Sequence, residues 1–132
     1  MCIRDRARTA LQAQADWGAE RIVAEHNFGG ALVEATLRGL NPNAALRMVT
    51  ASRGKAARAE PVAALYEQGR VTHHGALCVL EEQLCQFSAS GYHGARSPDR
   101  ADALVWALSD LMLSTPPPAP ARWVPTRFNI GR

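Results

Sequence analysis

The feature that most constrains the fold is a pair of short β-branched runs that are separated by a helical stretch. "RIVAE" (residues 21–25) and "LRMVTA" (46–51) each have the length of one buried strand. Between them, residues 31–40 keep helical spacing and "NPN" ends the helix. Strands that alternate with helices predict an α/β domain whose sheet is at least partly parallel.

The other segments continue this alternation. We expect further helices at residues 7–17, 61–68, 77–87 and 99–113, and a third, brief strand at residues 70–74. Pro61 is expected near the first turn of its helix, and Gly69 follows the end of that helix. With 132 residues, 47% of them hydrophobic, the chain can form one compact domain with a real core.

Cysteine usage and hydropathy limit the class of protein. Three cysteines without paired spacing argue against a disulfide scaffold and favour a reducing compartment. Cys78 and Cys85 are one heptad apart beside a leucine stripe, so we expect both to be buried. No apolar run approaches membrane-spanning length and no leader is visible. The prediction is a soluble, cytoplasmic protein without a membrane partner.

The two ends are expected to lie outside the domain. "MCIRDR" (residues 1–6) resembles a translated sequencing adapter, so the domain is predicted to span residues 7–115 and the gene to extend upstream. Residues 116–132 form a proline-rich tail, expected to be extended or disordered. This tail holds three arginines and no acid, which accounts for the whole net charge of +3. The basic pI is therefore a weak indication of nucleic-acid binding.

The helix predicted at residues 99–113 carries acids close to its apolar face. Ser97 suits the N-cap and Pro98 the first helical position. At about 100° per residue, one apolar face is formed by Ala101, Leu104, Val105, Leu108, Leu111 and Met112. Asp99 and Asp110 lie roughly opposite this face, but Asp102 lies at its edge. A carboxylate there must be hydrogen-bonded, paired or metal-bound.

Glu25 ends the first predicted strand and precedes a glycine-bearing turn. Ligands collect at the carboxyl ends of strands in α/β sheets, and Gly29 and Gly30 would let a backbone or a phosphate come close. Taken alone, Glu25 is better explained as a surface glutamate in a loop. His73 and His74 have no zinc-site spacing, so we expect no metal role for them.

Four segments together resemble a known family. "VAEHNFGGALVEATLR", "ASRGKAARAEPVAALYEQGRVTHHG", "LEEQLCQF" and "SPDRADALVWALSDLM" occur in this order within residues 8–113. They resemble the C-terminal nuclease half of the large subunit of phage-type terminases, the DNA-packaging motors of tailed phages and gene transfer agents. The resemblance implies an RNase H-like fold, a mixed sheet flanked by helices, that holds Mg²⁺ or Mn²⁺ through carboxylates.

The resemblance also implies site residues. Glu25 matches the acid at the end of a central strand, Asp102 the acid on the closing helix, and Asp99 is a possible auxiliary metal ligand. Hard divalent cations prefer carboxylate oxygens, and two such ions can support hydrolysis of a phosphodiester. Lys55 and Arg58 lie in a family-like block, and with Arg53 they are predicted to contact DNA phosphates, although a solvated basic loop would show the same pattern.

Two features of the family are not matched. The family places another aspartate on its first strand, and Asp16 on the first helix is no substitute; the motor motif G-x-x-x-x-G-K-[ST] is also absent. We therefore expect a partial domain that lacks N-terminal strands and is inactive alone. The predicted function is endonuclease cleavage of concatemeric DNA, with double-stranded DNA, the terminase small subunit and the portal protein as partners. The alternatives are a transposase, integrase or resolvase, or a non-catalytic domain that binds DNA or the portal.

Overall fold

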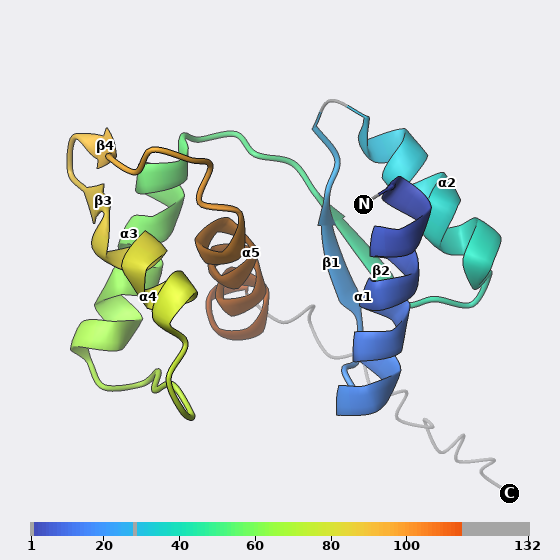
Figure 1. The fold of residues 1–132 in the computed structure, drawn as a ribbon, viewed down its shortest axis with the longest axis horizontal. Helices are drawn as coiled ribbons and strands as arrows, with labels where there is room; N and C mark the ends of the chain where they lie inside the picture. The colour runs from blue at the N-terminus through green and yellow to red at the C-terminus, as the bar shows by residue number, and fades with distance from the viewer. Residues whose placement is uncertain (1, 28, 115–132) are drawn as a thin grey trace, which may run out of the picture.

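The structure, a computed structural model, describes residues 2–27 and 29–114 and mixes helices with short strands (Figure 1). In chain order the elements are α1 (Ile3–Trp17), β1 (Ile22–Glu25), α2 (Gly30–Leu40), β2 (Leu46–Val49), α3 (Lys55–Glu67), α4 (Cys78–Cys85), β3 (Phe87–Ser88), β4 (Gly91–Tyr92), α5 (Asp99–Leu108) and a π-helical turn, η1 (Ser109–Leu113). Helix α1 begins inside the segment that resembles an adapter, and the origin of that segment stays a prediction. The proline-rich tail lies outside the described residues.

The first half of the chain forms the predicted strand–helix–strand unit. Strands β1 and β2 pair in parallel, with register from Ile22 opposite Leu46 to Glu25 opposite Val49, so the parallel pairing is confirmed. Helix α2 starts after Gly29, whose φ of 95° is a left-handed conformation that glycine adopts without steric cost. Helices α1 and α2 pack against each other on one side of this pair of strands, and α5 lies on the other side (Figure 1).

The second half contains α3, α4, α5 and an antiparallel hairpin. The hairpin pairs Phe87 with Tyr92 and Ser88 with Gly91, and the sequence did not predict it. The prediction of a third strand at residues 70–74 is wrong, because in the described part of the chain this segment pairs with no strand. The His73 side chain in this segment instead bridges Tyr66 on α3 and Glu81 on α4, so the segment connects these two helices.

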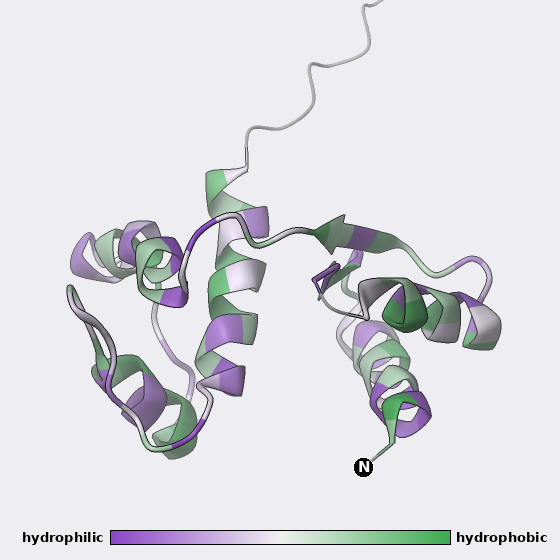
Figure 2. Cartoon of the chain, turned by 90° about the horizontal axis from the view of Figure 1, so that it is seen from above, coloured by the Kyte–Doolittle hydropathy of each residue, from purple (hydrophilic) through white to green (hydrophobic). Residues whose placement is uncertain are grey.

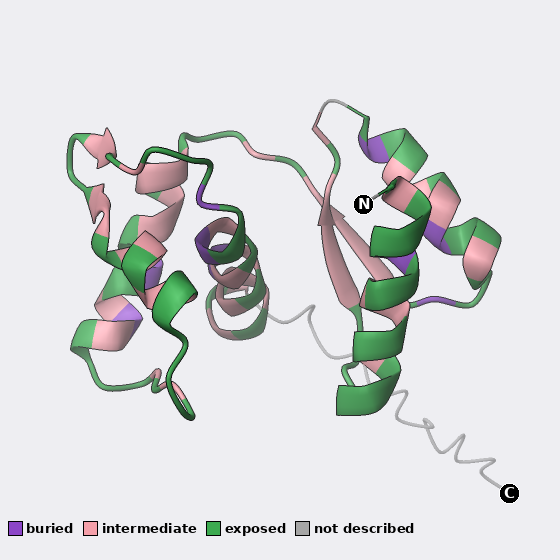
Figure 3. Cartoon of the chain, in the orientation of Figure 1, coloured by how far each residue is buried: buried purple, intermediate pink, exposed green. Residues whose placement is uncertain are grey.

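The buried residues form two groups, one within each half of the chain (Figure 3). Among the described residues, Ala7, Leu37 and Ala44 are buried in the first half, and Val62, Leu65, Ala101 and Val105 in the second. Along the helices, apolar residues alternate with polar ones (Figure 2), as expected for helices that each bury one face. None of the helices in this described part is long and apolar enough to cross a membrane.

Several local predictions are wrong for identifiable reasons. Helix α3 begins at Lys55, so Pro61 lies inside the helix and not in its first turn; its exposed position lets the helix tolerate the missing backbone donor. Cys78 and Cys85 are exposed, because the short helix α4 buries none of its residues completely. The predicted long final helix changes at Ser109 into a π-helical turn.

Candidate active site

Acidic side chains from two distant segments line one pocket of about 370 Å³. Glu25 comes from the last position of β1, and Asp99 and Asp102 come from the first turn of α5. Trp106 and Arg21 complete its polar rim. The pocket therefore lies between the two halves of the chain and is shaped by how α5 docks beside β1.

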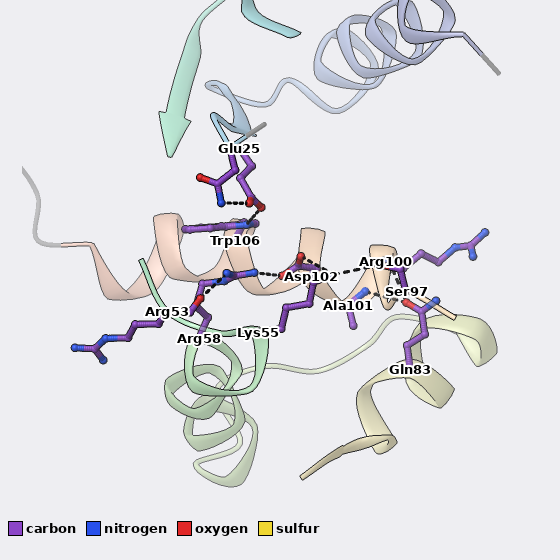
Figure 4. Close-up of polar contacts among 11 residues, drawn as sticks. Glu25, Arg53, Lys55, Arg58, Gln83, Ser97, Arg100, Ala101, Asp102 and Trp106 are labelled. Carbon is purple, nitrogen blue, oxygen red and sulfur yellow. Dashed lines mark hydrogen bonds and ion pairs between the residues drawn. The ribbon is translucent and has the colours of Figure 1, made fainter. Parts of the chain in front are cut away.

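Both carboxylate oxygens of Glu25 accept hydrogen bonds (Figure 4). The Asn27 side-chain amide donates to Oε1 at 2.7 Å, and the Trp106 indole Nε1 donates to Oε2 at 3.1 Å. These bonds fix the orientation of a half-buried carboxylate at the end of the strand. They also connect β1 directly to α5.

Asp102 is held by two basic side chains of α3. The Arg58 Nη2 donates to Oδ1 at 2.7 Å, and the Lys55 Nζ lies 3.3 Å from Oδ2. The Asp102 side chain is 16% exposed. A carboxylate at the edge of a buried stripe requires such partners, and ion pairing is how this chain meets that requirement.

Arg58 and Trp106 connect the two acids. The Arg58 guanidinium lies 4.9 Å from the centroid of the Trp106 ring, a distance suited to a cation–π contact. A continuous series of contacts therefore runs from Glu25 through Trp106 and Arg58 to Asp102 (Figure 4). The sequence analysis assigned no role to Trp106; its spacing of four residues from Asp102, on the same face of the helix, was the available signal.

The start of α5 differs from the predicted cap. Pro98 and not Ser97 occupies the N-cap position, and Ser97 Oγ accepts a hydrogen bond from Lys55 at 3.1 Å. The free backbone N–H groups of Arg100 and Ala101 donate to Oε1 of Gln83, each at 3.1 Å. A side chain from α4 thus takes the place of the expected serine cap.

Asp110 is half-buried, because its side chain points toward the first half of the chain. Its side chain is 9% exposed and accepts hydrogen bonds from Arg21 Nε at 2.7 Å and from Arg47 Nη1. The bond to Asp110 raises the pKa of Arg21 above its usual range. Asp110 follows Trp106 by four residues, and both side chains bond to the first half of the chain, so the side of the helix opposite its apolar face is covered by that half. Leu111, predicted to be apolar core, is 78% exposed, so this prediction is wrong.

The three basic residues predicted to bind DNA have different surroundings. Arg53 is exposed, and its carbonyl accepts a hydrogen bond from Arg58 at 2.8 Å. The Lys55 side chain is 39% exposed, whereas that of Arg58 is 11% exposed. DNA contact by these residues stays a prediction, and Arg53 and Lys55 offer the more accessible charge.

A second polar network lies away from the acids. His73 joins the Tyr66 hydroxyl at 2.8 Å to the Glu81 carboxylate at 2.9 Å. The hydrogen bond from His73 lowers the pKa of Glu81, and burial raises the pKa of Tyr66. This network stabilises the connection between α3 and α4, and it contributes nothing to the pocket of Glu25 and Asp102.

The acid pocket fits a divalent cation in ligand type. Within residues 2–27 and 29–114, no group of three or more His, Cys, Asp or Glu side chains is close enough to form a complete protein cage for a metal. Mg²⁺, however, is typically bound through one or two carboxylates together with waters and substrate phosphates. A cation at Asp102 would have to compete with the two positively charged side chains that already pair with this carboxylate.

An α/β domain in which a strand-end acid and a helix acid share one pocket is compatible with an RNase H-like nuclease. The comparison with protein families agrees: residues 5–111 match the model of the terminase RNase H-like domain. The match covers most of the chain, so this protein belongs to the terminase RNase H-like domain family, which supports a nuclease-type role in a terminase. The family assignment does not favour the transposase, integrase and resolvase alternatives. Searches of the curated proteins and of the solved structures gave no match.

Proposed function

We propose that this chain is the nuclease part of a terminase large subunit that cuts concatemeric viral or gene-transfer-agent DNA with the help of Mg²⁺ or Mn²⁺. The observation that carries the proposal is the pocket shared by Glu25, Asp99 and Asp102, in a chain of this family. Glu25 and Asp102 act as the catalytic metal ligands and Asp99 as an auxiliary. When bound, the cation would supply positive charge that polarises a phosphodiester and stabilises the departing 3′ oxygen.

The residues of the chain have distinct parts in this proposal. Asn27 and Trp106 orient Glu25 through their hydrogen bonds. Lys55, which contacts Asp102, and the exposed Arg53 of the preceding loop attract the DNA backbone in a sequence-independent and salt-sensitive way. The further acid that the family carries on its first strand would complete the ligand set. Double-stranded DNA, the small subunit and the portal protein are the proposed partners.

Cation binding is tested by calorimetric titration of the chain with Mn²⁺. Glu25→Gln and Asp102→Asn are expected to lower the affinity for Mn²⁺ at least tenfold, because each substitution removes a charged oxygen ligand. The matched controls are Glu34→Gln and Asp16→Asn, which remove the same charge from helix surfaces. These controls should bind Mn²⁺ as the unaltered chain does.

Cleavage is tested by nicking of supercoiled plasmid, with this chain and with a longer gene product that includes the family's first strand. The longer product should nick the plasmid only with Mg²⁺ or Mn²⁺ and should lose this activity in both acid variants, whereas this chain alone is expected to be inactive. Salt-sensitive DNA binding without any Mn²⁺ binding would favour the non-catalytic alternative. Nicking that both acid variants retain would reject the assigned residues.

A further inference from the structure

Both oxygens of Asp102 are already in contact with positive charge. Arg58 and Lys55 lie one turn apart at the start of α3, and each approaches a different oxygen of the same carboxylate (Figure 4). A divalent cation that uses Asp102 therefore has to compete with at least one of them. Which of the two gives way depends on how firmly each is held.

Arg58 is the firmly held partner. Its side chain is 11% exposed, stacks on Trp106 and donates to the carbonyl of Arg53 as well as to Asp102. Moving it would break three contacts at once. Arginine also suits such a place, because its planar guanidinium can stack and bond at the same time.

Lys55 is the loosely held partner. Its ammonium lies 3.3 Å from Asp102, its side chain is 39% exposed, and its other polar contact is the exposed Ser97 hydroxyl. A lysine ammonium is a strongly hydrated charge on a flexible stem, so solvent readily replaces these contacts. Exposed ion pairs of this kind are weak.

We propose that Lys55 is an exchangeable counter-ion of Asp102: it pairs with the carboxylate in the absence of a divalent cation and is displaced when one binds, while Arg58 stays in place. The proposal rests on the proposed function, since it requires a cation at Asp102. The displaced ammonium stays beside the pocket, where it can meet a DNA phosphate. Cation binding and DNA binding would then favour each other, as thermodynamic linkage requires.

Lys55 is the only lysine in the 132-residue chain, which allows a direct test. With ¹³C-labelled lysine, its side chain gives one Cε–Hε signal in an NMR spectrum. Titration with Mg²⁺ should move this signal toward the position of a solvent-exposed lysine. In Asp102→Asn, the signal should begin at that position and should not move. A Lys55 signal that stays unchanged while calorimetry shows Mn²⁺ binding that depends on Asp102 overturns the exchange but leaves the proposed function intact.

Affinity gives a second readout. Removing a competing charge by Lys55→Gln should tighten Mn²⁺ binding about two- to fivefold, the range expected for loss of one exposed ion pair. Arg53→Gln is the matched control, because it removes the same charge from the neighbouring loop without touching Asp102. Equal tightening in both variants would show a long-range charge effect and overturn the exchange. Failure of the unaltered chain to bind any divalent cation would overturn the exchange and the proposed cation site together.

Discussion

The ion cluster around Asp110 is predicted to dock the end of α5 on the two-stranded sheet. Asp110→Ala removes one hydrogen bond from Arg21 and one from Arg47. Such bonds between charged groups are worth about 1.5–3 kcal/mol each when shielded from water, and exposed ion pairs about 0.2–1 kcal/mol. The carboxylate is 9% exposed, but the two arginine side chains are 42% and 41% exposed. We therefore take about 1 kcal/mol per bond and expect a loss of about 2 kcal/mol in the free energy of unfolding.

Urea unfolding followed by circular dichroism measures this loss. Arg21→Ala and Arg47→Ala should each lose about half of it, since each removes one of the two bonds. Asp16→Ala is the control, because Asp16 is an exposed carboxylate on α1 whose hydrogen bond within the described part of the chain comes from its helix neighbour Gln12. This control should stay within about 0.5 kcal/mol of the unaltered chain. A loss below about 0.5 kcal/mol for Asp110→Ala would refute the docking role.

Two further predictions concern the second half of the chain. Val105→Ala should lower the free energy of unfolding by about 2 kcal/mol, because Val105 is 1% exposed and the smaller side chain leaves a cavity. Leu111→Ala, at a side chain that is 78% exposed, should change this free energy little. Urea unfolding compares the two variants. Glu81→Gln should destabilise the chain at neutral pH but not in acid. Because the pKa of Glu81 is lowered below its ordinary 4.5, its contribution is complete above pH 4.5 and is lost as the pH falls through the lowered value. The gap in urea midpoint between the two chains should therefore begin to narrow below pH 4.5 and close once the pH is below the lowered pKa of Glu81. A gap that persists in stronger acid would contradict the role of the ionised carboxylate.

The strand–helix–strand unit could be predicted because its evidence is local. The β-branched runs of β1 and β2 and the helical spacing of α2 each identify one element without reference to the rest of the chain. The position of Asp102 was also readable, since its angle on α5 places it at the margin of the buried face, beside Val105. That angle predicted a need for partners, and the ion pairs with Lys55 and Arg58 meet it.

What the sequence did not reveal depends on packing between elements. A helical wheel drawn for one helix cannot anticipate that the first half of the chain shields Asp110 or that Leu111 stays exposed. The exposure of Cys78 follows from how little surface α4 covers, which the leucine stripe alone does not determine. Arg58, read as part of a basic loop, lies on helix α3, largely buried against Trp106. For Asp110 and Arg58 the residue type was informative, but the partner came from a distant segment.

The location of the acid pocket follows from the division of the chain into two halves. The buried apolar side chains form one group in each half, and neither group includes the acids. Glu25 belongs to the first half and Asp102 to the second, so their separation is set by polar contacts that cross between the halves: Trp106 with Glu25, and Asp110 with Arg21 and Arg47. Polar contacts are directional, which lets them fix a distance that nonspecific apolar packing would leave loose. Because they hold α5 beside β1, a cation bound by both acids would in turn stabilise the docking of the two halves.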